Sequence, residues 1–223
     1  MLTTKQLLQQ MELQDTLNKL VHPEWTQQNF RWHVAAMMEA AELLDHIGWK
    51  WWKATPEPDV EQIRLELVDI WHFVLSSMLS AYSGDTVLAA ANMSSTLGML
   101  STTCTYNGTE KTVLAFIHRC AIGAIDLTHL VPLMRHYDIT GDKLHSMYVG
   151  KNVLNIFRQH HGYQDGTYVK TWHGREDNEV LAEMMVQYPD AAPNELLFML
   201  EHTYSTLNAN PQPTGAEPPC ASI

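Results

Sequence analysis

The sequence has few cysteines and no long apolar run. Its three cysteines, Cys104, Cys120 and Cys220, stand far apart in 223 residues. They lack the close pairing of disulfide or zinc frameworks, so we expect reduced thiols. No run of about 18 apolar residues occurs, and the first residues, MLTTKQLLQQMELQ, are too polar for a signal peptide. These absences predict a cytoplasmic protein without a membrane span.

Positive charge is also scarce. The chain has 14 Lys and Arg against 25 Asp and Glu, a formal net charge of −11. Nonspecific binding to nucleic acid or to an anionic membrane needs an excess of Lys and Arg, so both are excluded. An acidic protein can still act on a nucleotide, provided that divalent cations lie between its carboxylates and the phosphates.

Strand-like alternation is almost absent, and apolar residues instead recur at helical spacing. We therefore predict an all-α helical bundle, with residues 1–206 as a single catalytic domain. Within it, residues 85–135 are a helical middle portion that serves as scaffold or subunit interface, and 162–178 form an ordered functional loop. Residues 207–223 are Pro-rich and polar, which predicts a disordered tail. The expected helices are 3–21, 26–47, 60–82, 85–101, 110–135, 140–161 and 179–206.

Two of these helices carry acids within apolar surroundings. In AAMMEAAELL at 35–44 the polar residues are Glu39 and Glu42, and in LELVDIWHFVL at 65–75 they are Glu66, Asp69 and His72. A spacing of three places each set on one helical face. Buried carboxylates need a compensating charge, and Lys and Arg are scarce in both segments. A cation from solution is therefore the better partner, and hard oxygen ligands indicate Mg²⁺ or Mn²⁺.

Positive residues gather only later in the chain. Lys151, Arg158, Lys170 and Arg175 stand close together in the sequence and indicate a phosphate clamp. An ordinary charged loop, balanced by neighbouring acids, is the alternative.

These motifs resemble, in order, those of the dimeric dUTPases, a branch of the all-α NTP pyrophosphohydrolases. The resemblance covers about 3–82 and 140–185. It implies a homodimer that hydrolyses dUTP to dUMP and pyrophosphate with Mg²⁺, and dUDP is a further candidate substrate. The matching segments are ELQDTLN at 12–18, ExxE at 39–42, GWKWWK at 48–53, ExxD at 66–69, KNVLNIFRQHHGY at 151–163 and DGTYVKTWHGREDN at 165–178.

The resemblance also implies roles for individual residues. Glu39, Glu42, Glu66 and Asp69 would hold the metal, and Glu39 would orient or deprotonate the attacking water. The substrate-binding residues that it implies face the base (Gln14, Asn18, His72), seat the nucleoside (Asn155, Tyr163) or reach the phosphates (Lys151, Arg158, Lys170, Arg175, with Asn178 nearby). Trp49 and Lys53 are further candidates for substrate binding. The alternative for Trp49 is packing in the core, and the alternative for Lys53 is an ordinary surface charge.

Three alternatives stay open. Each amide of Gln14 and Asn18 offers a donor and an acceptor, so residue types alone do not separate dUTP from dCTP as the substrate. A carboxylate-bridged di-iron bundle also uses acids on facing helices, but only Asp69-x-x-His72 resembles its Glu-x-x-His motif. The last alternative is a helical nucleotide-binding or regulatory interaction protein without activity.

Overall fold

The structure is a computed structural model that describes residues 2–52, 57–100, 104, 106–189 and 191–209. Within these residues the chain forms nine α-helices, one short 3₁₀ helix and one two-stranded hairpin, which confirms the all-α fold. Lys53 and residues 210–223 of the predicted tail lie outside the described residues. The elements are α1 (Thr4–Val21), η1 (Trp25–Gln27), α2 (Trp32–His46), α3 (Val60–Ala81), α4 (Thr86–Leu100), α5 (Thr109–Ala121), α6 (Leu127–His136), α7 (Gly141–His160), β1 (Thr171–Trp172), β2 (Arg175–Glu176), α8 (Asp177–Gln187) and α9 (Pro193–Ala209).

Side-chain caps fix where several helices begin. The hydroxyl of Thr3 accepts a hydrogen bond from the Gln6 backbone at the start of α1, and the Gln6 side chain accepts one from the Thr3 backbone. Asp59 caps α3 by accepting from the Gln62 backbone at 3.1 Å. Such caps satisfy amide groups that have no partner inside the helix. By fixing the first residue of each helix, the caps also fix the helical face on which each later side chain lies.

The helix boundaries differ from prediction at three places. The helix expected at 26–47 starts at Trp32, because Trp25–Gln27 forms the 3₁₀ turn η1. The helix expected at 110–135 is two helices, since Gly123 adopts a φ of 91° and Asp126 caps the start of α6. The helix expected at 179–206 begins earlier, at Asp177, and is interrupted between Gln187 and Pro193.

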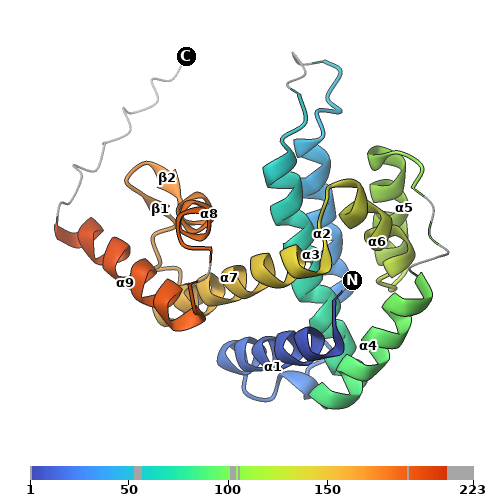
Figure 1. Cartoon of the computed structure of the whole chain (residues 1–223), viewed down its shortest axis with the longest axis horizontal. Helices are drawn as coiled ribbons and strands as arrows, with labels where there is room; N and C mark the ends of the chain where they lie inside the picture. Colours follow the sequence, from blue (N-terminus) through green and yellow to red (C-terminus); the bar gives the residue numbers. More distant parts are fainter. Residues whose placement is uncertain (1, 53–56, 101–103, 105, 190, 210–223) are drawn as a thin grey trace, which may run out of the picture.

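The main core lies among α1 to α7. Helices α2 and α3 run side by side as an antiparallel pair (Figure 1). The buried stripe of α2 contains Ala36, Ala40 and Leu43, and packs against Ile63 and Leu67 of α3. Small side chains at Ala36 and Ala40 allow a close approach of the two helices. The adjoining faces, which carry the acids, are consequently brought near each other.

A second, smaller core covers the C-terminal half of α7. Leu154 and Phe157 of α7 pack with Trp172 of the hairpin, Leu181 of α8 and Leu200 of α9. Strands β1 and β2 pair antiparallel, with Thr171 opposite Glu176 and Trp172 opposite Arg175. In Figure 1, α7 links the α1–α3 region to α8 and α9. Helix α7 therefore belongs to both cores.

Among the helices in the described part of the chain, none combines the length and the apolar character that crossing a lipid bilayer requires.

Candidate active site

Three carboxylates meet at the packed faces of α2 and α3. Oxygen atoms of Glu39, Glu42 and Glu66 all lie within 4.8 Å of one another. Glu66 is buried, Glu39 is half-buried and Glu42 is exposed. We call these three residues the acid cluster. Carboxylate oxygens at this spacing are a donor set for a hard divalent cation.

The acid cluster is electrostatically strained. Burial, together with the negative charges of Asp69 and Glu42, raises the pKa of Glu39 to about 7. Burial and the charges of Asp69 and Glu39 raise the pKa of Glu66 to about 8. His46 is the nearest basic side chain to Glu66, with its Nε2 3.6 Å from Oε1. The protein thus provides less positive charge here than the ionised carboxylates need.

Asp69 differs from the acid cluster because it has a cationic partner. Lys151 of α7, which is 3% exposed, places its Nζ 2.8 Å from Asp69 Oδ2 and 2.9 Å from Asn178 Oδ1. Asp69 therefore has a cationic partner within the protein, which the scarcity of Lys and Arg in the acidic segments did not indicate. Lys151 is distant in the sequence, so inspection of the acidic segments alone does not find it.

A cavity of about 580 Å³, which we call the acidic pocket, contains the acid cluster. Positive side chains from α7 and from the loop before β1 line the same cavity. Lys170 is about half exposed and forms an ion pair with Glu176 at 3.2 Å. The lining residues are Glu39, Glu42, His46, Gln62, Glu66, Asp69, Lys151, Arg158, Tyr163, Lys170, Glu176, Asn178 and Glu179.

A second cavity, of about 320 Å³, adjoins the first, and we call it the amide pocket. It shares Glu39, Asp69, Lys151, Arg158 and Tyr163 with the acidic pocket. Its other walls carry aromatic and amide side chains. They are Gln14, Leu17, Asn18, Val21, Trp25, Phe30, Trp32, His72, Phe73, Ser76, Asn155 and Gln159.

Hydrogen bonds fix the amide groups of this pocket. Gln14 Nε2 donates to Asn18 Oδ1 at 2.9 Å, and Asn18 Nδ2 donates to Ser76 Oγ at 3.1 Å. Tyr148 Oη donates to Gln14 Oε1 at 3.0 Å. Gln14, Asn18 and Ser76 are all buried. The network therefore fixes which amide atom is a donor and which is an acceptor.

His72 presents an acceptor nitrogen. Its Nδ1 lies 2.8 Å from Gln14 Oε1, so Nδ1 carries the proton that this oxygen accepts. Burial lowers the pKa of His72 to about 4, and the ring is therefore neutral at pH 7. Its Nε2 is buried and has no hydrogen-bond partner among the described residues. His72 is one of the residues that line the amide pocket.

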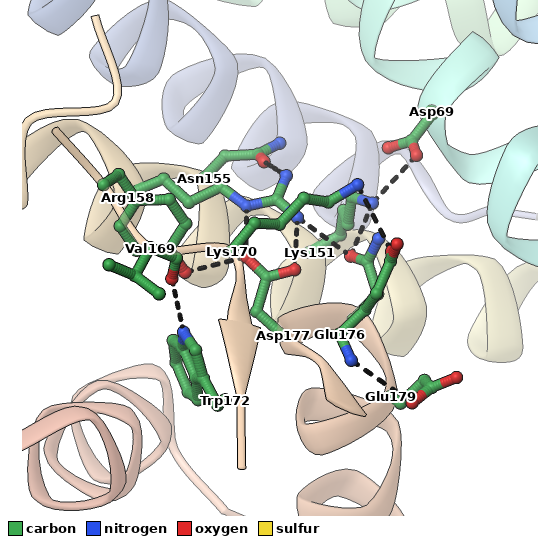
Figure 2. A network of polar contacts seen from close by, with 12 residues as sticks. Asp69, Lys151, Asn155, Arg158, Val169, Lys170, Trp172, Glu176, Asp177 and Glu179 are labelled. Atoms are coloured by element: carbon green, nitrogen blue, oxygen red, sulfur yellow. Dashed lines mark hydrogen bonds and ion pairs between the residues drawn. The ribbon is translucent and has the colours of Figure 1, made fainter. Parts of the chain in front are cut away.

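Arg158 is held between the two pockets by a buried ion pair, which Figure 2 shows. Its Nε and Nη2 donate to the two carboxylate oxygens of Asp177, each at 2.8 Å. Although burial alone would raise the pKa of Asp177, hydrogen bonds and charge from Arg158 lower it below its ordinary value. Asp177 is consequently ionised and Arg158 fixed.

The comparisons with known proteins place the chain in a family. A family model described as dUTPase matches residues 6–163. The chain belongs to the dUTPase family. Its activity is accordingly that of a dUTP diphosphatase. A search of curated proteins gave no match.

The structure brings most of the predicted site residues of this dUTPase together. Gln14, Asn18, His72, Asn155 and Tyr163 line the amide pocket, and the four acids and Lys151, Arg158, Lys170 and Asn178 line the acidic pocket. Two predicted residues lie elsewhere within the described part of the chain. Trp49 donates a hydrogen bond to Asp45 and packs on Trp52, and Arg175 pairs with Glu183. Neither lines either pocket.

Sequence analysis missed several residues of the dUTPase pockets. Ser76 follows His72 by one helical turn, so its spacing was a usable signal. Phe30, Trp32 and Phe73 look like ordinary core aromatics in the sequence. Asp177 lies outside both pockets but holds Arg158, and it gave no signal of its own because Arg158 belongs to another helix.

The acid cluster predicts that the metal-free protein loses stability as the pH rises above neutrality. The pKa values of Glu39 and Glu66, about 7 and about 8, exceed the ordinary 4.5. The folded state therefore binds more protons than the unfolded state up to about pH 8, and the stability slope is negative. Below about pH 6.5 the neutral His72 contributes the opposite slope.

In EDTA, the melting temperature should decrease between about pH 6.5 and about pH 8.5, as followed by circular dichroism. Glu66→Gln should flatten this decrease, because a neutral amide removes the titrating repulsion. Glu110→Gln, on the exposed start of α5, is the matched control and should keep the wild-type slope. A melting temperature that rises across this range contradicts the assignment.

Proposed function

We propose that the enzyme converts dUTP to dUMP and pyrophosphate with Mg²⁺, for which Mn²⁺ is a substitute. One observation carries this proposal. The acid cluster and the cations Lys151, Arg158 and Lys170 line a single cavity. The carboxylates of the acid cluster suit a divalent metal ion, and the positive side chains suit phosphate oxygens.

The donor set fits a hard divalent cation. Glu39, Glu42 and Glu66 supply oxygen atoms alone, and the raised pKa values of Glu39 and Glu66 reflect missing positive charge. Asp69 is the fourth proposed ligand, because its charge acts on both of these acids. Its Oδ2 also contacts Lys151, so Asp69 would share its charge between the lysine and the cation.

Mg²⁺, when bound, neutralises phosphate charge and lowers the pKa of a water molecule. Glu39 is the proposed group that orients or deprotonates the attacking water. It lines both pockets, which suits a nucleotide whose base lies in the amide pocket and whose phosphates lie in the acidic pocket.

The phosphates would be contacted by Arg158, Lys151 and Lys170, with Asn178 beside Lys151. Lys170 is half exposed, and its ion pair with Glu176 is the kind that contributes little to stability. Lys170 can therefore exchange Glu176 for a phosphate oxygen at small cost. Positioning and charge neutralisation by such groups account for most catalysis of phosphoryl transfer.

The amide pocket favours uracil over cytosine. Nε2 of neutral His72 is an acceptor without a partner in the described residues, and it complements the N3–H donor of uracil. Cytosine carries an unprotonated N3 at the corresponding place, so two lone pairs would face each other. Asn155 and Tyr163, which line the same pocket, are the proposed contacts of the nucleoside.

The first test is an assay of dUMP and pyrophosphate release from dUTP. Activity should require Mg²⁺ and disappear with excess EDTA. Glu39→Gln should lower kcat by about 100-fold or more while dUTP still binds, and Glu110→Gln should not change it. The substrates dUDP, dCTP, dTTP and UTP are measured in parallel. Full activity in EDTA, or wild-type kcat in Glu39→Gln, contradicts the mechanism.

A second test concerns the base. His72→Phe keeps an aromatic ring against Tyr148, 4.4 Å away between centroids, but removes the acceptor. We expect kcat/KM for dUTP to fall about tenfold, with no corresponding loss for dCTP. His160→Phe, at an exposed position on α7, is the control. An unchanged ratio of dUTP to dCTP turnover argues against His72 as the reader of N3.

We also propose that the enzyme is a homodimer. Val87 of α4 is 65% exposed, Leu114 of α5 is 47% exposed and Ile122 is 61% exposed, so the middle portion of the chain exposes apolar surface on more than one element. Such surface is typical of subunit contacts. Sedimentation of the purified chain should give twice the mass of 25.4 kDa. A monomer at micromolar concentration overturns this part of the proposal.

A further inference from the structure

Arg158 is unusually constrained for a residue that lines two pockets. Arg158 is 8% exposed, and Asp177 is 0% exposed. The two-pronged contact uses Nε and Nη2 of the guanidinium against Oδ2 and Oδ1 of the carboxylate. This geometry fixes the plane of the guanidinium as well as its position.

Asp177 is itself held by groups on the loop before the hairpin. Tyr168 Oη donates to Asp177 Oδ2 at 2.7 Å, and the Asp177 backbone amide donates to the Lys170 carbonyl at 3.0 Å. Asp177 is also the first residue of α8. The Asp177 carboxylate is thus held in place independently of Arg158 and can therefore orient the guanidinium.

The remaining contacts of Arg158 leave part of its edge available. Nη1 donates to Asn155 Oδ1 at 3.1 Å, and Nη2 donates a second, longer bond of 3.3 Å to Asn178 Oδ1. A guanidinium has five N–H groups. Among the described residues, the hydrogen bonds account for all of them except one on Nη1. That hydrogen is free for a ligand at the junction of the pockets.

We propose that Asp177 is a positioning residue, which fixes Arg158 so that its Nη1 edge is presented to the nucleotide. The inference rests on the proposed contact between Arg158 and the phosphates. Asp177 acts through Arg158 and lines neither pocket itself. Because the guanidinium is already oriented, binding does not have to immobilise a flexible side chain.

The neighbour of Asp177 in the chain links a second cation to Arg158. Asn178, the next residue in the chain, accepts from Lys151 Nζ at 2.9 Å. Lys151 in turn contacts Asp69. One continuous set of polar contacts therefore runs from Tyr168 through Asp177, Arg158 and Asn178 to Lys151 and Asp69. Figure 2 shows its Asp177–Arg158 and Lys151–Asp69 contacts. Displacement of Asp177 should disturb both cations.

Chemical rescue separates positioning from a structural role. Arg158→Ala should lose activity. Millimolar guanidinium should then raise the residual kcat of this variant at least tenfold, because it occupies the place beside Asp177. In Arg158→Ala/Asp177→Asn the same guanidinium should restore nothing. Circular dichroism and melting curves establish that each variant is folded. Glu183→Gln removes the exposed partner of Arg175 and should keep wild-type kcat and KM.

The outcomes separate the proposed role of Arg158 in phosphate binding from the proposed positioning role of Asp177. Wild-type activity in Arg158→Ala overturns the proposed role of Arg158. Loss of activity with equal rescue, or with no rescue in either background, overturns the positioning role of Asp177 alone.

If Arg158→Ala does not fold, the comparison uses Arg158→Lys, which cannot form the two-pronged contact. Asp177→Asn should lower kcat about tenfold or more in wild type but add little to Arg158→Lys. Tyr168→Phe removes only one hydrogen bond of Asp177 and should lower kcat less than Asp177→Asn does. Fully additive losses in the double variant overturn the proposal.

Discussion

The repulsion within the acid cluster is the constraint on which the rest of the site depends. Near a protein surface, two like charges about 4 Å apart repel by about 4 kcal/mol. Glu39, Glu42 and Glu66 meet at such short range because α2 and α3 pack closely through Ala36 and Ala40. The apolar contacts of these helices therefore offset a local electrostatic cost, and the raised pKa values of Glu39 and Glu66 are its sign.

Helix α7 is the element that converts this strained arrangement into a site for an anionic substrate. Its N-terminal half packs in the main core, and its C-terminal half packs in the second core. Lys151 and Arg158 stand about two turns apart on this helix and line both pockets. The cations are thus attached to one helix that contacts α3, one of the two acidic helices, and also α8.

The sequence was sufficient to predict the local part of the site. The spacing of Glu39 to Glu42 and of Glu66 to Asp69 implies shared helical faces, because helical periodicity is a local property. The Lys151–Asp69 and Arg158–Asp177 pairs connect residues far apart in the chain, and their formation depends on how whole helices pack. Single-sequence reasoning has no access to that packing.

The misplaced boundaries and residues have similar causes. The break between α5 and α6 was encoded by Gly123 and Asp126, but the apolar pattern on either side concealed it. Arg175 lies two positions before Asp177, yet it points to Glu183, since it belongs to β2 and not to the helix that follows. A difference of one element boundary is enough to move a side chain from the site to the surface.

The division of charge at the site explains why an external cation is needed in addition to the protein's own. The principal cations each have a buried or half-buried acid as partner, as Arg158 has Asp177 and Lys151 has Asp69. The three acids of the cluster have no lysine or arginine within ion-pair distance in the described residues. A triphosphate adds further negative charge to this cavity. Lysine and arginine side chains that are already paired cannot balance the charge of the acid cluster and that of the triphosphate. The additional positive charge must therefore come from divalent cations that bind with the nucleotide or before it.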